Sequence, residues 1–477
     1  MAQQFPPRGF GPDAGETAPD RRWGNASKLS ARWDYSGRKI LLGSHEGREI
    51  GDPDAEGFPA GSGDDRHIVT IAGTRAGKSS TVLVPNLRRY PGSVVVIDPK
   101  GELAETTAHA RRRFGDVHIL DPFRITSEKC REFCSSYNPF SELTEAPDHL
   151  KPANAALIAD ALIVHVGNSE THWTDAARNF IRGLVLHLLE DPLEARLGKL
   201  REYLSSDTEE LIGLIEDMAG NDVFDGIVAN TGRAFRAKLE NGQPSRELQS
   251  IMSTANEQTW PLDDVTHVSD GHDFYLSSLS EKPMTVYLVL PASRLATHAK
   301  WLRLMINLTI TAIEQKPVRG LRAGALPIWL VLEEFAALGN LRSIETAAGF
   351  MAGMGCKLWV VLQDLTQLKT HYPNSWETFL GNAGILQAWS NVDATTTEYL
   401  SKLIGQTTIL ETRFDTVGES GQQRGDTGER TQFRTVPLLD AAEVGYFLAR
   451  ETGRQLILSP GRPPLFLERL KPDTEGA

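Results

Sequence analysis

The chain is poor in cysteine. Only three cysteines, Cys130, Cys134 and Cys356, occur in 477 residues. So few, and an odd number, are typical of a protein that folds in a reducing compartment without a disulfide framework. Cys130 and Cys134 have a metal-like spacing, but no second pair and no histidine cluster lies near them in the sequence. An ordinary loop or helix is therefore favoured over a zinc site.

Long hydrophobic runs are also missing. A membrane-spanning helix needs about 18 consecutive apolar residues, whereas the longest apolar stretches, SVVVI and PIWLVL, have the length of strands. The N-terminal segment, residues 1–24, lacks the apolar core of a signal peptide. Its proline, glycine and charged residues predict a disordered tail. We therefore expect a cytoplasmic protein.

An excess of positive charge is absent as well. Lysine and arginine number 50 against 62 aspartates and glutamates, which gives a formal charge of −12. This balance excludes a surface that is basic all over, although a localised basic patch or a basic pore remains possible. The length predicts two or three domains, and a hydrophobic content of 40% with 23% charged residues is ordinary for a soluble globular protein.

What the sequence does contain is an alternation of strand and helix patterns. Between about residues 65 and 125, three short apolar runs rich in β-branched residues (HIVTIA, SVVVIDP and VHILDPF) are separated by helix-like stretches. Similar runs return after residue 280: PMTVYLVLP, LPIWLVLEEF, CKLWVVLQD, GILQAWS and RQLILSPG. The alternation predicts an α/β fold with a parallel-rich central sheet that is completed by the later segments.

The intervening residues, 145–275, have a different texture. Apolar residues recur there at helical spacing, and one stripe comprises Ala177, Phe180, Ile181, Leu184 and Leu188. Thr174 precedes this stripe and is the predicted N-cap of its helix. We therefore expect an all-α domain at 145–275 inserted into one α/β domain formed by 25–144 and 276–477. A polar, glycine-rich segment at 411–433 is predicted to be a mobile loop.

The window AGTRAGKS, residues 72–79, resembles a phosphate-binding loop between a strand and a helix. Such a loop needs backbone N–H groups directed at an anion and a helix N-terminus behind them. Ala72 occupies the position of the first consensus glycine, and we expect Gly73 to supply the freedom needed for the turn. The predicted nucleotide-binding residues are Gly73, Thr74, Arg75, Ala76, Gly77, Lys78, Ser79 and Ser80. Lys78 would contact the β and γ phosphates, and Ser79 would hold Mg²⁺.

Hydrolysis requires a further acid at the end of a neighbouring strand. Glu333 and Glu334 directly follow the apolar run 328–332. Glu334 is the candidate general base and Glu333 the candidate metal ligand, although a solvated acidic pair is the alternative. Gln363 ends the next strand pattern and could sense the γ-phosphate or orient water. The predicted catalytic set is Lys78, Glu333, Glu334 and Gln363.

These motifs occur together with others in a recognisable order. HIVTIAGTRAGKSSTVLVPNL is followed by GSVVVIDPKGELAE, THWTDAARNFIRGL, LVLEEFAALGNL, GCKLWVVLQDLTQL and GNAGILQAWSNVDATTTEYLSKLIGQTT. The series resembles the coupling ATPases of type IV secretion and conjugative DNA transfer over roughly residues 25–470. The resemblance implies a RecA-like P-loop NTPase domain with an inserted all-α domain. In it, Glu333 and Glu334 match the Walker B pair, and Lys100, Gly101 and Glu102 match a structural or nucleotide-adjacent turn.

The resemblance also implies a function and partners. It implies a hexameric ring that uses ATP and Mg²⁺ to deliver DNA, single-stranded and carried with a relaxase, to the components of a secretion channel. A neighbouring subunit would supply an arginine to the γ-phosphate, for which the candidates are Arg342, Arg413 and Arg434. The run 111–113 could face DNA, although a solvated helix end is the common alternative.

Two departures from that family pattern matter. Glu333 stands where the family has aspartate, which leaves open a nucleotide-dependent adapter that hydrolyses little ATP. A DNA pump of another ring-motor class is a further alternative. Members of the family mostly begin with transmembrane helices, and this sequence shows none. We therefore expect a cytoplasmic protein, peripheral at the inner face of the cell membrane, whose membrane association depends on a partner protein.

Overall fold

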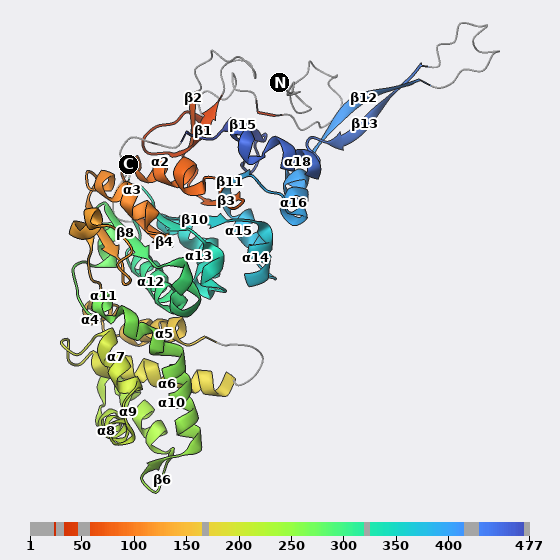
Figure 1. Ribbon diagram of the computed structural model, residues 1–477. Helices are drawn as coiled ribbons and strands as arrows, with labels where there is room; N and C mark the ends of the chain where they lie inside the picture. The colour runs from red at the N-terminus through yellow and green to blue at the C-terminus, as the bar shows by residue number, and fades with distance from the viewer. Residues whose placement is uncertain are drawn as a thin grey trace, which may run out of the picture. The chain divides into compact units, whose positions relative to one another are not determined.

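The computed structural model describes residues 23–24, 33–45, 58–164, 171–318, 325–414 and 429–471 (Figure 1). The chain divides into two compact units. Unit 1 comprises residues 1–90 and 360–476, and unit 2 comprises residues 91–359 with the last residue. Most of the predicted tail, residues 1–22, lies outside the described residues. Its last two residues, Trp23 and Gly24, are placed against the C-terminal segment: Trp23 is buried on Phe466, and the N–H of Gly24 donates to the carbonyl of Pro464.

The strands of unit 1 combine one parallel pair with antiparallel neighbours. Their order is β2 (Phe58–Ser62), β1 (Ile40–His45), β15 (Leu465–Glu468), β14 (Arg454–Leu458), β11 (Ala383–Trp389) and β3 (His67–Ala72). A further strand, β10 (Cys356–Leu362), has its C-terminal end in unit 1.

The pair β3–β11 positions the predicted phosphate-binding loop. These strands run parallel, and Trp389 at the end of β11 is paired with Ala72 at the end of β3. Every residue of β3 is buried, as expected for a continuous β-branched run in the middle of a sheet. The ends of both strands therefore reach the same edge.

Unit 2 contains four parallel strands in the order β9 (Ile328–Leu332), β4 (Val94–Asp98), β8 (Met284–Val289) and β5 (Asp116–Leu120). The later strands β8 and β9 flank β4, so segments after residue 280 complete the sheet begun earlier in the chain. The predicted α/β fold with a parallel-rich sheet is confirmed. The short strands β1, β2 and β15 were not predicted; β2, with sequence FPAGS, carries the proline and glycine that weaken a strand pattern.

Helices connect and cover these strands. In unit 1 they are α2 (Val84–Leu87), α14 (Leu365–His371), α15 (Trp376–Gly381), α16 (Ala394–Ile404) and α18 (Ala441–Phe447). In unit 2 the helices next to the strands are α3 (Glu102–Arg111), α12 (Leu295–Gln315) and α13 (Arg342–Phe350).

Between β5 and β8 the described elements are almost entirely helical. The α-helices are α4 (Ser141–Glu145), α5 (Lys151–Leu162), α6 (Thr171–Leu188), α7 (Leu197–Leu204), α8 (Thr208–Gly220), α9 (Val223–Arg236), α10 (Arg246–Thr259) and α11 (Thr266–Ser269). A two-residue pair, β6 (Leu239–Glu240) with β7 (Gln243–Pro244), interrupts them. Helices α6 to α10 group together at one end of this unit (Figure 1). The proposed boundaries at 145 and 275 remain a prediction.

The apolar stripe of α6 is buried as expected, since all five of its residues are at most 4% exposed. The predicted N-cap is wrong. Helix α6 begins at Thr171, and the hydroxyl of Thr174 donates to the carbonyl of Thr171 at 3.0 Å from within the first turn. A threonine hydroxyl can bond backward in this way inside a helix, so the residue type alone does not fix the boundary.

The predicted loop at 411–433 is bounded by strands. β12 (Gln406–Phe414) and β13 (Glu429–Pro437) form a two-stranded antiparallel ribbon that extends away from α16 and α18 (Figure 1). Residues 415–428 lie outside the described residues. Leu410 and Phe433 are cross-strand partners and are 58% and 73% exposed. Because even these apolar side chains are exposed, the ribbon buries little, and a search for buried apolar runs does not find its strands.

No helix within the described ranges has the length and hydropathy that crossing a bilayer would require. In the same ranges, no three histidine, cysteine or acidic side chains come together as a metal site would need. All three cysteines are free, and burial raises the pKa of Cys130 to about 11.

Candidate functional site

The loop after β3 has the backbone of an anion-binding turn. Arg75 and Gly77 adopt positive φ angles of 56° and 82°, and Lys78 is right-handed. A π-helical turn, Ser79–Leu83, follows directly and leads into α2. Alternation between left- and right-handed residues turns successive N–H groups toward one concave side, which suits an anion. The predicted strand–loop–helix arrangement is thus present in unit 1.

Gly73 serves the loop in a different way from the one expected. It does not adopt a positive φ, so the conformational freedom of glycine is not what the position uses. Instead, a Cβ atom on Gly73 would lie 2.3 Å from the carbonyl oxygen of Ser390, a contact that no side chain can make. Ala72, the last residue of β3, is fully buried in the strand and needs no glycine.

The ammonium group of Lys78 lies against the loop itself. Its Nζ donates to the carbonyls of Ala72 at 2.7 Å and Gly73 at 3.1 Å. The hydroxyl of Thr81 donates to the carbonyl of Gly77 at 2.8 Å. Lysine charge, glycine flexibility and a helix start are therefore concentrated in one short segment.

Gln363 lies beside this loop. It directly follows β10, and its Oε1 accepts a hydrogen bond from the hydroxyl of Thr74 at 3.1 Å. The backbone carbonyl of Gln363 accepts from Nδ2 of Asn391 at 3.3 Å. Two residues of the predicted site, Thr74 and Gln363, are thus in direct contact within unit 1.

Sequence reasoning missed two side chains that hold the loop from behind. Nε1 of Trp389 and Nη1 of Arg469 each donate to the carbonyl oxygen of Ala76, both at 2.8 Å. Trp389 lies in the motif GILQAWSN, and Arg469 follows the last strand, β15. Their separation from the loop in sequence is so large that no local pattern could have linked them to it.

Glu333 and Glu334 end strand β9 in unit 2. Glu333 is only 8% exposed although it is an acid. Glu334 has φ 53° and ψ 44°, a left-handed conformation that non-glycine residues adopt rarely. Strained backbone of this type is common at functional sites. The prediction that these two acids end a buried strand is met by the fold.

Asp98 is a further acid at the same edge of unit 2. The pairing of Ile97 with Leu332 means that Asp98 and Glu333 are the next residues of adjacent parallel strands. Asp98 is fully buried, and its Oδ2 accepts from the N–H of Ala104 at 2.8 Å. Burial raises the pKa of this carboxyl to about 6. Sequence reasoning singled out the neighbouring turn but not this residue.

The turn after Asp98 begins helix α3. Gly101 has φ +71° and is the N-cap of α3, while Glu102 lies in the first helical turn. Lys100 is exposed. The glycine is required by its left-handed backbone. This accounts for the structural part of the predicted role of Lys100, Gly101 and Glu102.

The candidate arginines have different environments. Arg342 is exposed at the start of α13, and Arg434 is exposed on β13, 3.7 Å from a carboxylate oxygen of Glu411. Arg413 belongs to β12, and its side chain lies outside the described residues. None of these positions tests a role at a neighbouring subunit.

The suggestion that the whole run 111–113 faces DNA is wrong for its first residue. Arg111 is 1% exposed, and its guanidinium donates to the hydroxyl of Thr285 and the carbonyl of Gly92. Arg112 and Arg113 are exposed. Arg111 therefore stabilises the interior of unit 2.

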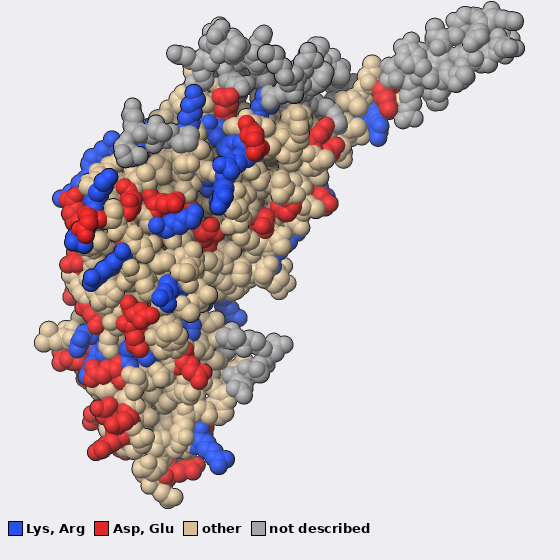
Figure 2. Space-filling view, in the orientation of Figure 1, with Lys and Arg blue, Asp and Glu red and all other residues tan. Residues whose placement is uncertain are grey.

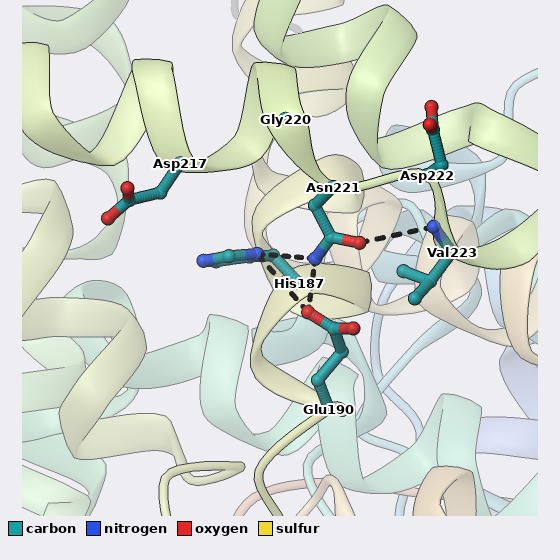
Figure 3. Close-up of a pocket in the computed structure, with 7 residues that line it drawn as sticks. All are labelled: His187, Glu190, Asp217, Gly220, Asn221, Asp222 and Val223. Carbon is teal, nitrogen blue, oxygen red and sulfur yellow. Dashed lines mark hydrogen bonds and ion pairs between the residues drawn. The ribbon is translucent and has the colours of Figure 1, made fainter.

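A hollow of about 540 Å³ lies in unit 2 among helices α6, α8 and α9 (Figure 3). Its acidic lining residues are Glu190, Asp217 and Asp222. Nδ2 of Asn221 contacts both His187 and Glu190, while its Oδ1 accepts from the N–H of Val223 (Figure 3). Acidic side chains also gather over α8 and α9 on the face shown in Figure 2. This concentration of negative charge disfavours phosphate binding there.

An α/β fold with a loop of the phosphate-binding type after one strand and an acid pair after another has the architecture of the P-loop NTPase fold. Residues 31–471 match the family described as type IV secretory system conjugative DNA transfer. The chain belongs to this family.

Known relatives agree with this assignment. Protein VirD4 of Agrobacterium fabrum (strain C58) is 26% identical over 422 residues, which cover 86% of this chain and 59% of that protein. The conjugal transfer protein TraG of Escherichia coli is 27% identical over 374 residues, which cover 74% of this chain and 57% of that protein. The chain thus spans about three fifths of the length of these curated relatives.

Solved structures share the fold. The unbound bacterial conjugative coupling protein TrwBdeltaN70 aligns with a TM-score of 0.67 at 15% identity and covers 97% of this chain and 95% of that one. TrwB in complex with ADP and Mg²⁺ aligns with a TM-score of 0.63 at 16% identity, covering 97% of both chains. The predicted RecA-like α/β fold is confirmed by these similarities.

Proposed function

We propose that the chain is an ATP-driven coupling protein of type IV secretion and conjugation that recruits and translocates DNA or a relaxase–DNA substrate. The observation that carries this proposal is the loop at 73–80 in a chain that belongs to the conjugative DNA transfer family. The loop combines a left-handed Gly77, an adjacent lysine and a helix start, the features that bind nucleotide phosphates.

ATP with Mg²⁺ is the proposed cofactor. The loop fits a phosphate group because the left-handed Gly77 is followed directly by the cation of Lys78 and the start of a helix. TrwB, which shares the fold, has been crystallised with ADP and Mg²⁺ and with a non-hydrolysable ATP analogue. Ser79 and Glu333 offer the hydroxyl and carboxylate oxygens that Mg²⁺ prefers. Bound Mg²⁺ supplies neutralisation of phosphate charge.

The proposed catalytic roles follow from side-chain chemistry. Lys78 binds the β and γ oxygens, and Glu334 accepts the proton of the attacking water. Gln363 orients that water or senses the γ-phosphate, a role supported by its hydrogen bond with Thr74. The strained backbone of Glu334 supports a position selected for function rather than for stability.

The proposed partners are DNA in single-stranded form with a relaxase, and components of a secretion channel. The proposed assembly is a hexameric ring that is cytoplasmic and peripheral to the membrane through a partner protein. The proposed inserted domain at 145–275 is supported by the helices α5 to α11. Helix α8 carries acidic residues and neither lysine nor arginine, so its surface is unsuited to the DNA backbone.

The test is ATP turnover by the purified chain with Mg²⁺, with and without DNA. We expect turnover that rises with DNA and disappears in Lys78→Ala and Glu334→Gln. Lys402→Ala, which changes an exposed lysine on α16, is the matched control and should keep full activity. ATP binding without turnover above background would instead support the adapter function, which the glutamate at position 333 leaves open.

A further inference from the structure

The carbonyl oxygen of Ala76 is held by two side chains from distant parts of unit 1. Nε1 of Trp389 and Nη1 of Arg469 donate to it, both at 2.8 Å. A carbonyl oxygen has two lone pairs, so these two donors use its full capacity. Ala76 itself is only 2% exposed.

This contact fixes the orientation of one peptide plane. In a trans peptide the C=O and the following N–H point in opposite directions. The carbonyl of Ala76 points toward Trp389 and Arg469, so the N–H of Gly77 points away from them. Gly77 also has φ +82°, which directs the chain into the helix start at Lys78 and Ser79.

Both donors are themselves firmly held. Trp389 is fully buried and is paired in register with Ala72 at the end of the strand that precedes the loop. The N–H of Arg469 donates to the carbonyl of Gly453 at 2.7 Å, and its Nη2 donates to the carbonyl of Arg450. Its backbone N–H and its Nη2 are therefore both anchored. Because a guanidinium is planar and rigid, these two bonds also set the direction in which Nη1 points.

We infer that Trp389 and Arg469 are positioning residues that hold the Ala76–Gly77 peptide in the orientation in which the Gly77 amide faces a nucleotide phosphate. The inference rests on the proposed function of the loop. It assigns a binding role to the C-terminal end of the chain, because Arg469 follows β15 and reaches back to the loop. A preorganised amide binds an anion without first reorienting, which is why losing either donor weakens phosphate binding.

The experiment measures the Kd of ATP with Mg²⁺ and of pyrophosphate with Mg²⁺ by calorimetry, together with the Tm of each free protein. The variants are Trp389→Phe, which keeps an aromatic ring but removes the N–H donor, and Arg469→Met, which keeps an unbranched apolar stem but removes the guanidinium and its charge. The matched control is Arg462→Met. Arg462 stacks on Trp33 with its guanidinium carbon 4.8 Å from the ring centroid.

We expect each variant to raise both Kd values about tenfold. This is the equivalent of losing one hydrogen bond from the Gly77 amide to a charged phosphate. The Arg462→Met control should leave both within twofold of the wild type. Arg469→Lys retains a positively charged donor, so its Kd values should lie between those of the wild type and Arg469→Met. Parallel loss for pyrophosphate and ATP with an unchanged Tm of the free protein is the signature of phosphate positioning, because a purely structural role would lower the Tm.

Each outcome has one meaning. If wild-type protein binds neither ATP nor pyrophosphate, the proposed function of the loop is wrong. If the wild type binds both and Trp389→Phe and Arg469→Met bind them equally well, the positioning inference is wrong while the proposed function stands. If Arg469→Met fails to fold, the Kd values of Trp389→Phe and Arg469→Lys take its place. Wild-type Kd values in both of these variants would then show that the positioning inference is wrong.

Discussion

The strand ends of the two units carry opposite chemistry. In unit 1 the ends of β3, β10 and β11 present a bare glycine-containing backbone, the cation of Lys78 and the amides of Gln363 and Asn391. In unit 2 the ends of β4 and β9 present the buried acids Asp98 and Glu333, followed by the strained Glu334. The first set attracts an anion and the second repels it. The proposed phosphate binding and the proposed proton acceptance thus belong to different parts of the chain.

This difference makes separable predictions, the largest for the acid edge. Glu334→Gln removes the proposed base while keeping the size of the side chain. We expect ATP turnover to fall about 10²–10⁴-fold with little change in the Kd for ATP, because the amide cannot accept the proton. Steady-state turnover and calorimetry on the same samples measure the two quantities. A variant that loses binding in proportion to turnover would break the distinction between the two edges.

Asp98 predicts a pH dependence of stability in unit 2. Its folded pKa of about 6 lies above the ordinary value of 3.8. The folded state therefore binds this proton more tightly, and the free energy of unfolding should fall as the pH rises from about 4 through 6. The fall would amount to at most about 3 kcal/mol, since one pKa unit corresponds to about 1.4 kcal/mol.

Asp98→Asn removes the titrating proton at nearly constant volume. Urea unfolding across pH 4–7 should show that the free energy of unfolding of the variant does not fall with pH as that of the wild type does. The stability of the variant relative to the wild type should therefore increase as the pH rises. Asp217→Asn, on the exposed surface of α8, is the control and should follow the wild-type profile. Identical profiles for Asp98→Asn and the wild type would mean that the buried carboxyl does not carry the effect.

The glycine edge of unit 1 can be tested by adding one methyl group. A Cβ at position 73 would lie 2.3 Å from the carbonyl oxygen of Ser390. A Cβ added to Gly381, by contrast, would have no atom within 4 Å. We expect Gly73→Ala to destabilise the protein by about 1–3 kcal/mol, as overpacking does. Gly381→Ala should be neutral or slightly stabilising. Chemical unfolding of both variants provides the measurement, and equal stabilities would show that the close approach at Gly73 is not required.

The smallest expected effect concerns the acid that departs from the family pattern. Glu333→Asp shortens the side chain by one methylene and introduces the residue that the family resemblance led us to expect. We expect ATP turnover to change severalfold, about 1 kcal/mol in the activation free energy, with an unchanged Kd. A rise would indicate that glutamate at this position slows hydrolysis, and a loss beyond tenfold would show that the site is adapted to the longer side chain.

The sequence predicted those features that depend on local patterns. Buried β-branched runs identified β3, β4, β8 and β9, and helical periodicity identified the buried face of α6, because burial on one or both faces imposes its own spacing. The strand–loop–helix arrangement around residues 73–80 was predicted for the same reason. Its glycine, lysine and serine are contiguous and follow a strand.

Features set by distant contacts could not be predicted in this way. The bonds from Trp389 and Arg469 to Ala76 depend on the register of β11 with β3 and on the path of the C-terminal strands. Gly73 was assigned conformational freedom, but the constraint is the approach of Ser390, which only tertiary structure reveals. Arg111 was read as a surface charge because nothing local indicates that its guanidinium is buried against Thr285.

The most direct test of the contrast between the two edges is the Kd of ATP with Mg²⁺ for the wild type, Lys78→Ala and Glu334→Gln, measured side by side by calorimetry. We predict that Lys78→Ala loses binding by at least about tenfold, the loss expected from a charged hydrogen-bond donor, while Glu334→Gln binds as the wild type does. Undiminished binding in Lys78→Ala together with lost binding in Glu334→Gln would contradict the account.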